Sequence, residues 1–196
     1  MQLVVLTGGI GTGKSVVARM LQTMGYHTYD SDRAAQRLMN HDPVVRQQLV
    51  EAFGADTYLA NGTLNRPHLA SVAFASDERR LQLNGIVHPA VKDDIRRWAD
   101  ALAAQGEQVC FVETALARTS GLDAVATQVW HVTAPTPLRV QRVMARSGLT
   151  PAQVEARIAA QQTEEGINPG EKTLVNDGAV ALLPQVIALL QALNVM

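Results

Sequence analysis

The sequence predicts an α/β fold in which helices cover both faces of a parallel β-sheet. Five short apolar runs alternate with segments of helical periodicity or turn residues, a pattern typical of parallel strands buried between helices. A glycine-rich segment also follows the first run and leads directly into a helical pattern. The expected strands are Leu3–Leu6, His27–Tyr29, Val109–Val112, Gln128–Val132 and Thr173–Val175.

The composition is that of an ordinary globular protein with one substantial core. Of its 196 residues, 47% are hydrophobic and 18% are charged, and the formal net charge is −1. A nearly neutral chain offers no global positive field for nucleic acid, so attraction for an anionic ligand must be local. Cys110 is the only cysteine, which excludes an intrachain disulfide and a cysteine-based zinc site.

The apolar runs are too short to span a membrane. The first run has no basic segment before it and reaches glycine within a few residues, so it does not match a signal peptide. The single cysteine fits a reducing compartment. We therefore expect a cytoplasmic protein that binds neither membranes nor nucleic acid and shows no sign of an obligatory protein partner.

Two inserts are expected to interrupt the sheet. Residues 32–105 show only helical and turn signals, too long a stretch for a simple crossover, and predict a helical insert. A smaller insert covers residues 137–170, where Thr150-Pro151-Ala152-Gln153 has the N-cap, proline and capping-box residue of a helix start. A final helix is expected to begin near Pro184. The first insert contains an amphipathic helix, indicated by Val87, Val91, Ile95, Trp98 and Leu102.

Residues 8–15 match a phosphate-binding loop. Glycines let backbone N–H groups turn inward around phosphate oxygens, and the following helix presents its positive end to the same anion. Lys14 adds a charge for the β- and γ-phosphates, and the Ser15 hydroxyl can bind Mg²⁺. The competing interpretation is a glycine-rich turn without a ligand. The segment reads Gly8-Gly9-Ile10-Gly11-Thr12-Gly13-Lys14-Ser15 and fits G-x-x-x-x-G-K-[ST] between a predicted strand and a predicted helix, which favours nucleoside triphosphate binding.

Two carboxylates follow the second predicted strand, at the edge where α/β sheets bind ligands. Of Asp30 and Asp32, one can hold Mg²⁺ through water while the other accepts the proton of an attacking hydroxyl. Either residue alone could instead cap the next helix. A guanine-nucleotide switch protein would need an N-K-x-D motif, which is missing, and a DNA-dependent motor would need a longer chain with a basic channel. The size, charge and aspartate pair favour a small-molecule kinase.

Further motifs extend this pattern over nearly the whole chain. The phosphate loop and Asp30-Ser31-Asp32 are followed in order by Phe53-Gly54, Gly62-Thr63-Leu64-Asn65-Arg66, Ile86-Val87-His88-Pro89, Arg142-Val143-Met144-Ala145-Arg146, Ala159-Ala160-Gln161 and Asn176-Asp177-Gly178. The phosphate loop by itself is generic, but the ordered set is specific. It resembles the dephospho-coenzyme A kinase family, which catalyses the last step of coenzyme A synthesis.

The resemblance implies a P-loop kinase fold of the adenylate-kinase-like type. The fold has three layers, with helices on both faces of a five-stranded parallel sheet in the order 2-3-1-4-5. Residues 1–31, 106–136 and 171–196 would form the core of a single chain. Residues 32–105 would hold the acceptor, dephospho-coenzyme A, and residues 137–170 would form a closing lid.

The same resemblance implies roles for individual residues. Asp32 would be the general base on the ribose 3′-hydroxyl of the acceptor, with Asp30 as a structural or Mg²⁺-side partner. Lys14 and Arg146 would complete the catalytic set, with ATP and Mg²⁺ as donor and cofactor. Asn176 would contact adenine, although Asn-Asp-Gly is also an ordinary turn. Candidate acceptor contacts are Arg66, His88 and Glu113, of which His88 could equally be a packed or capping residue.

Three arginines share one face of a predicted helix. Arg139, Arg142 and Arg146 fall at positions i, i+3 and i+7, which by themselves predict a solvated basic face. The resemblance assigns Arg142 to ATP binding and Arg146 to the transferred phosphate, where an arginine can stack on adenine or balance developing charge. Arg139 matches nothing in the family pattern. We expect it to be solvated and its replacement to be nearly silent.

The chain departs from the family pattern in two places. Residues 113–119 keep an acidic group at Glu113 but lack the family's proline and terminal glutamate, which puts details of acceptor binding in doubt. After Gln161 the family often carries arginine, whereas this chain has Thr163-Glu164-Glu165. That change removes one candidate phosphate clamp and leaves more of the task to Lys14 and Arg146.

Two alternatives remain at the level of sequence. A shikimate- or gluconate-type kinase also combines a phosphate loop with a D-x-D strand end. Such kinases need an arginine cluster for a carboxylate acceptor, and residues 33–120 show none. The other alternative is a nucleotide-binding relative without transfer activity.

Overall fold

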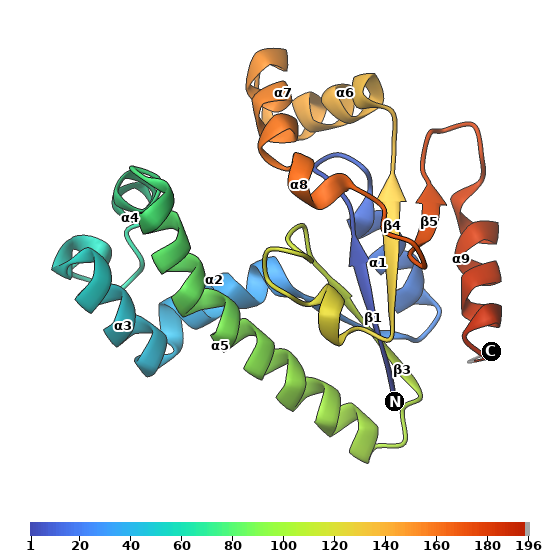
Figure 1. The fold of residues 1–196 in the computed structure, drawn as a ribbon, viewed down its shortest axis with the longest axis horizontal. Coiled ribbons are helices and arrows are strands. Elements are labelled where there is room, and N and C mark those ends of the chain that lie inside the picture. Colours follow the sequence, from blue (N-terminus) through green and yellow to red (C-terminus); the bar gives the residue numbers. More distant parts are fainter. Residues whose placement is uncertain (195–196) are drawn as a thin grey trace. The chain divides into compact units, whose positions relative to one another are not determined.

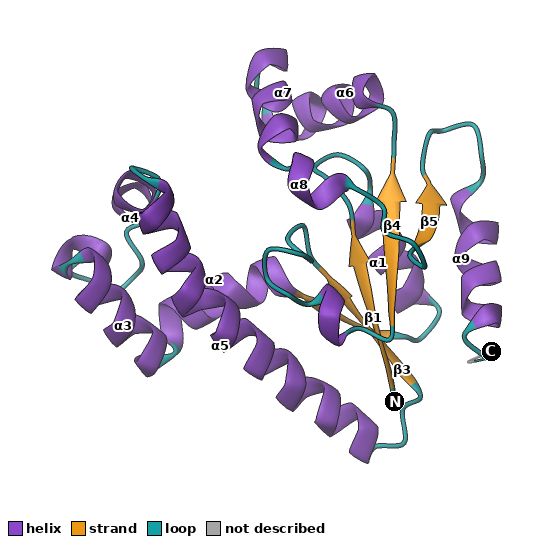
Figure 2. Cartoon of the chain, in the orientation of Figure 1, coloured by secondary structure: helices purple, strands orange, loops and turns teal. Residues whose placement is uncertain are grey.

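The computed structural model of this chain describes residues 1–194, and a five-stranded parallel sheet lies at its centre. The strand order is β2-β3-β1-β4-β5, as the family resemblance implied. Strands β1, β4 and β5 can be followed in Figures 1 and 2. Each predicted strand is present within one residue of its expected ends. The strands are β1 (Gln2–Thr7), β2 (His27–Asp30), β3 (Val109–Glu113), β4 (Gln128–Thr133) and β5 (Lys172–Val175).

The register brings polar residues together at the carboxyl edge of the sheet. Leu6 pairs with Glu113 and Asp30 pairs with the same Glu113, while Thr7 pairs with His131 on β4. Because all strands are parallel, these ends share one edge, where α/β sheets bind ligands.

Helices α1 (Lys14–Thr23) and α9 (Leu182–Ala192) pack on one face of the sheet. Val17 and Leu21 of α1, and Val186 and Leu190 of α9, are completely buried. Consecutive residues of the central strands are also buried, for example Val4–Thr7, so both faces of the sheet are covered.

Contacts divide the chain into two compact units. The sheet unit comprises residues 1–30 and 101–196, and the helical unit comprises residues 31–100. The helical unit has its own apolar core, which includes Leu49, Phe53 and Leu69. Its elements are α2 (Ser31–His41), α3 (Pro43–Phe53), the short 3-10 helix Ala55–Thr57, α4 (Arg66–Ala73) and most of α5 (Asp77–Ala104).

Three helices follow β4 within the sheet unit and precede β5 (Figure 1). They are α6 (Thr136–Ser147), α7 (Pro151–Ala160) and α8 (Gln162–Glu165), and a 3-10 helix at Asp123–Val125 precedes β4. The predicted helix start is confirmed: Thr150 accepts from the Gln153 N–H while the Gln153 side chain accepts from the Thr150 N–H. The final helix begins two residues before Pro184.

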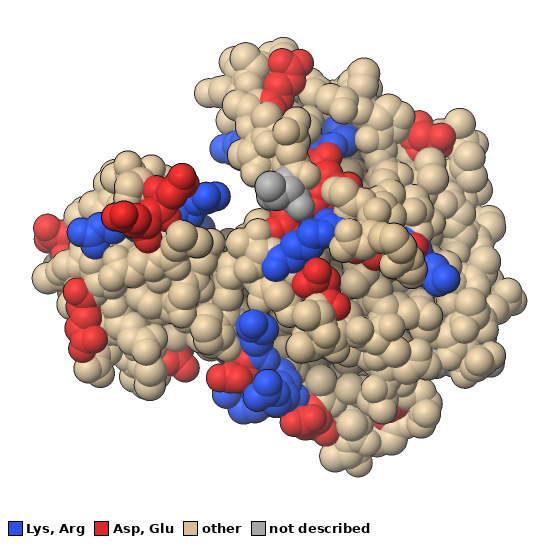
Figure 3. Space-filling view, in the orientation of Figure 1, with Lys and Arg blue, Asp and Glu red and all other residues tan. Residues whose placement is uncertain are grey.

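The surface carries charges of both signs, as the nearly neutral net charge of the chain predicts. On the face drawn in Figure 3, Lys and Arg are interspersed with Asp and Glu, and no continuous basic surface is visible there. Within residues 1–194, no helix combines the length and the apolar character that a membrane crossing requires.

We predict that Thr150→Ala destabilises the fold by ~1 kcal/mol, the usual cost of removing an N-cap hydroxyl. The reason is that Thr150 satisfies an N–H of α7 that no helical carbonyl reaches. Urea unfolding measures the loss. Thr136→Ala is the control, because α6 has Pro135 as its N-cap and no side-chain cap bond. Equal losses in both variants would contradict the capping role.

Candidate active site

The phosphate-loop sequence forms a turn between β1 and α1 that favours glycine. Gly8, Gly11 and Gly13 have φ angles of 142°, 79° and 101°, conformations that side chains rarely adopt. Gly13 is also the N-cap of α1. The loop therefore ends at the N-terminus of α1, which is a favourable place for an anion.

Neighbouring atoms leave no room for a Cβ atom on the four glycines of the loop, which are Gly8, Gly9, Gly11 and Gly13. A Cβ on Gly8 would lie 2.3 Å from the Val132 carbonyl oxygen, and one on Gly13 would lie 2.1 Å from Asn176 Nδ2. A Cβ on Gly9 would lie 2.1 Å from Glu165 Oε1. Atoms from three later segments of the chain thus approach the loop backbone closely.

The Lys14 side chain lies along the loop. Its Nζ donates to the Gly8 carbonyl at 2.6 Å and to the Gly9 carbonyl at 3.3 Å. The buried Thr12 hydroxyl donates to the Gly9 carbonyl at 2.9 Å. The ammonium group is therefore held at the loop, where it can balance the charge of a phosphate.

Arg142 and Asn176 lie together at the other end of the loop. Asn176 Nδ2 donates to the Thr12 carbonyl at 2.8 Å, and Arg142 donates to the Asn176 carbonyl at 3.0 Å. Arg142 Nη2 also donates to Asn176 Oδ1 at 3.3 Å. The structure thus joins two of the predicted ATP-binding residues to each other and to the phosphate loop. Arg146, one turn further along α6, is exposed.

The expectation for Arg139 was wrong. This residue is only 4% exposed, because its guanidinium lies against the phosphate loop instead of in solvent. Arg139 Nε donates to the Ile10 carbonyl at 2.8 Å, and Nη1 and Nη2 bind the Glu165 carboxylate at 2.9 and 2.5 Å. Helical spacing placed the three arginines on one face but could not show which of them α8 would cover.

The two departures from the family pattern meet in space. Glu164, on α8, is 2% exposed, and its carboxylate accepts from the backbone N–H groups of Arg118 and Thr119 at 2.9 and 2.8 Å. Arg118 in turn donates to the Glu164 carbonyl and to the Glu171 carboxylate. Sequence analysis treated both stretches only as losses, because nothing in the sequence indicates that they pair.

His131 is buried on β4 beside this network. Its Nδ1 lies 3.7 Å from Glu171 Oε2. Burial lowers the pKa of His131, and the positive charge of Arg118 acts in the same direction, while Glu171 and Glu165 oppose the shift. The net effect favours the neutral imidazole.

The side chains predicted to bind Mg²⁺ are suited to an ion that phosphate oxygens also coordinate. Ser15 and Asp30 are both exposed, and Asp30 pairs in register with Glu113. Within residues 1–194, no three His, Cys, Asp or Glu side chains form a metal cluster. Because Mg²⁺ usually takes one or two protein ligands plus phosphate oxygens and waters, a hydroxyl and a carboxylate fit this mode of binding.

The remaining predicted residues belong to the helical unit. Asp32 lies in the first turn of α2 and is exposed. Arg66 begins α4, and its Nη2 donates to Gln36 Oε1 on α2 at 3.0 Å. His88 lies within α5, directly before Pro89.

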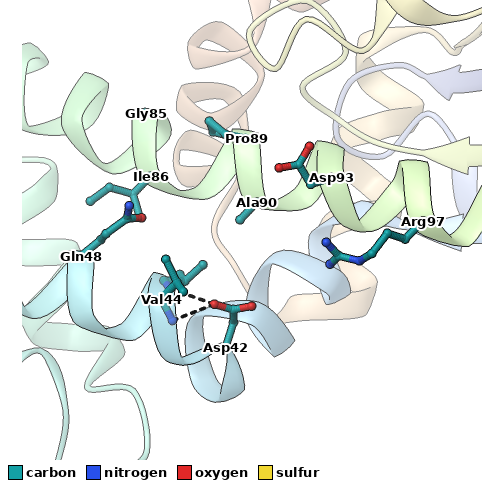
Figure 4. Close-up of a pocket in the computed structure, with 10 residues that line it drawn as sticks. Asp42, Val44, Gln48, Gly85, Ile86, Pro89, Ala90, Asp93 and Arg97 are labelled. Carbon is teal, nitrogen blue, oxygen red and sulfur yellow. Dashed lines mark hydrogen bonds between the residues drawn. The ribbon is translucent and has the colours of Figure 1, made fainter.

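A cavity of about 340 Å³ lies between α3 and α5 of the helical unit (Figure 4). Apolar side chains such as Val44 and Ile86 line it together with the charged groups of Asp93 and Arg97. Asp42, which caps α3 through the N–H groups of Val44 and Val45, closes one end. The predicted acceptor residues Asp32, Arg66 and His88 are not among its lining residues.

Comparison with known proteins identifies the family. The family model described as dephospho-CoA kinase matches residues 2–181. The chain belongs to the dephospho-CoA kinase family. A dephospho-CoA kinase of Porphyromonas gingivalis is 38% identical over 191 residues, which cover 96% of this chain and 93% of that protein. Membership makes the chain an ATP-dependent kinase, and the sequence prediction of its class is confirmed.

Solved structures share the fold of this chain. A Thermus thermophilus protein is 32% identical and superposes with a TM-score of 0.79, covering 98% of this chain and 96% of that one. A dephospho-CoA kinase from Campylobacter jejuni has a TM-score of 0.67 at 19% identity, covering 97% of this chain and 96% of that chain. At that identity the second similarity supports the P-loop kinase fold alone.

We predict that Gly13→Ala weakens ATP binding to this kinase by at least about tenfold, or ~1.4 kcal/mol. The new Cβ would overlap Asn176 Nδ2 and push it from the loop. Calorimetric titration with ATP measures the change. Gly106→Ala is the matched control, because Gly106 has φ 87° but no neighbour within 4 Å, so it shares the backbone strain without the overlap. Unchanged affinity in Gly13→Ala would contradict the loop's role.

Proposed function

We propose that this chain transfers the γ-phosphate of ATP to the ribose 3′-hydroxyl of dephospho-coenzyme A to give coenzyme A. Membership in the family names the reaction class. The observation that carries the proposal for this chain is the glycine loop, whose backbone is closely approached by later segments of the chain. Lys14 Nζ lies at this loop, 2.6 Å from the Gly8 carbonyl oxygen. Such a loop binds the phosphates of a nucleotide, and phosphoryl transfer depends mainly on positioning and charge stabilisation.

In the proposed mechanism, residues 9–15 hold the ATP phosphates. Backbone N–H groups at the start of α1 bind the phosphate oxygens, and Lys14 moves from the Gly8 and Gly9 carbonyls to the β- and γ-phosphates. Asn176, in the loop after β5, and Arg142, on α6, hold adenine. Their mutual hydrogen bonds support this role, because they orient both groups before the nucleotide arrives.

Ser15 and Asp30 are the residues proposed to hold Mg²⁺. When bound, the ion neutralises charge on the transferred phosphate. Arg146 adds a further positive charge once ATP is in place. Its exposure in the structure supports a role that begins only when the region of residues 137–170 closes as a lid.

Asp32 is the proposed general base. It orients the ribose hydroxyl and accepts its proton as the new P–O bond forms. Arg66, His88 and Glu113 are proposed contacts of the acceptor, which residues 32–105 would bind, while residues 1–31, 106–136 and 171–196 form the core. A cytoplasmic location remains a prediction.

The acceptor is tested by a coupled assay of ADP release. Dephospho-coenzyme A, adenosine and shikimate are offered in parallel to the same enzyme with ATP and Mg²⁺. We expect turnover with dephospho-coenzyme A at least about 10²-fold above the others, because remote parts of the true acceptor supply binding energy for the transition state. Preference for shikimate would replace the proposed acceptor, and ATP binding without turnover would indicate a relative that lacks transfer activity.

We predict that Asp32→Asn lowers kcat roughly 10²-fold while ATP affinity changes little. Asparagine keeps the shape and one acceptor oxygen, but it cannot take the proton. Asp30→Asn is the paired variant, and it should alter the Mg²⁺ dependence or the stability instead. The measurements are kcat, the KM for dephospho-coenzyme A and the Mg²⁺ titration of both variants. If Asp32→Asn matches wild type while Asp30→Asn is inactive, the two roles are reversed.

A further inference from the structure

Ile10 of the phosphate loop contacts α6 and the end of α7 through both its backbone and its side chain. The Ile10 N–H donates to Gln161 Oε1 at 2.7 Å, at the end of α7. The Ile10 carbonyl accepts from Arg139 Nε on α6 at 2.8 Å. The Ile10 side chain packs against the small apolar cluster of Val143, Val154 and Ile158.

Arg139 is at the centre of this attachment. All three guanidinium nitrogens donate, one to Ile10 and two to the Glu165 carboxylate. A Cβ on Gly9 would lie 2.3 Å from Arg139 Nη2, and one on Gly11 would lie 2.8 Å from the Arg139 carbonyl oxygen. Arg139 therefore contacts the loop on both sides of Ile10, through its side chain and through its backbone.

The loop needs such support for a physical reason. Glycine loses more conformational freedom on ordering than any other residue, and the glycines at positions 8, 9, 11 and 13 surround Ile10. A loop of this composition does not fix its own conformation. Contacts from elsewhere in the chain must therefore select the conformation in which the N–H groups point at the phosphates.

We propose that Arg139 is a positioning residue for ATP binding, which acts by holding the Ile10 carbonyl while Glu165 holds the guanidinium. The inference rests on the proposed function of the loop as the ATP site. Only arginine can serve both partners, because its planar fork binds a carboxylate with two nitrogens and leaves Nε for the carbonyl. Residues 136–165 thereby contribute to ATP binding before any lid movement.

The test compares Arg139→Gln, Arg139→Lys and the exchanged pair Arg139→Glu/Glu165→Arg in the full-length protein. Calorimetric titration gives the Kd of ATP, thermal unfolding gives Tm, and steady-state assays separate the KM for ATP from kcat and from the acceptor KM. Arg157→Ala, an exposed arginine on α7, is the control for loss of a positive charge in the same region.

We expect Arg139→Gln to raise the Kd and the KM for ATP at least about tenfold, with the acceptor KM unchanged and Arg157→Ala like wild type. The exchanged pair keeps opposite charges together but places no donor on Ile10, so ATP affinity should stay low. Arg139→Lys keeps the charge opposite Glu165 but loses the fork, so it should retain the wild-type Tm and still lose about fivefold in affinity. This variant decides the matter if Arg139→Gln does not fold.

Two results would overturn the proposal. Recovery of wild-type ATP affinity in the exchanged pair would mean that Arg139 matters only as half of an ion pair. Wild-type affinity in Arg139→Gln, or in Arg139→Lys where the glutamine variant is unfolded, would mean that Arg139 has no part in ATP binding. A wild-type protein that does not bind ATP would instead refute the proposed function, which keeps the two failures distinct.

Discussion

The site depends on one constraint: a backbone turn must bring several N–H groups to a single anion, and side chains on that turn would obstruct it. The structure meets this constraint with glycines, three of which have positive φ. The missing Cβ atoms of Gly8, Gly13 and Gly9 make room for the Val132 carbonyl, Asn176 and Glu165, respectively. The same glycines leave the turn flexible. The conformation of the loop is therefore restricted by contacts from other elements, which are β4, the loop after β5 and helices α6 to α8.

Two ion pairs connect residues between β4 and β5 to each other or to the segment before β4. Arg139 and Arg118 are each paired with a glutamate, Glu165 and Glu171, and the two arginine side chains are 5% and 20% exposed, respectively. Isolated surface ion pairs add little stability, but the two parallel hydrogen bonds between Arg139 and Glu165 restrict the orientation of the guanidinium. The family resemblance treated the stretch with Glu164 and Glu165 only as the loss of one candidate phosphate clamp. In the structure Glu164 binds residues 118–119 and Glu165 binds Arg139.

The strands and the phosphate loop could be predicted from the sequence because their signals are local. An apolar run, a turn residue and a capping box each lie within a few positions, so β1 to β5 and the start of α7 appear where expected. Arg142 and Asn176 are 34 residues apart, so no local signal connects them. Only the resemblance to a family predicted that both contribute to ATP binding. The roles of Asp32, Arg66 and His88 remain predictions, because these residues belong to the helical unit and the loop belongs to the sheet unit.

The sequence by itself determined the class of protein: a phosphate loop, an aspartate pair after the second strand and an ordered set of motifs define a kinase of the dephospho-CoA kinase family. Only the tertiary structure decided what surrounds the loop. Helical periodicity says that Arg139, Arg142 and Arg146 share a face, yet it is silent about what packs on that face. Arg139 is buried where Glu165 of α8, which is distant in sequence, packs against it, whereas Arg146 is exposed. Helical spacing could not separate the two, because the environment of a side chain depends on long-range packing.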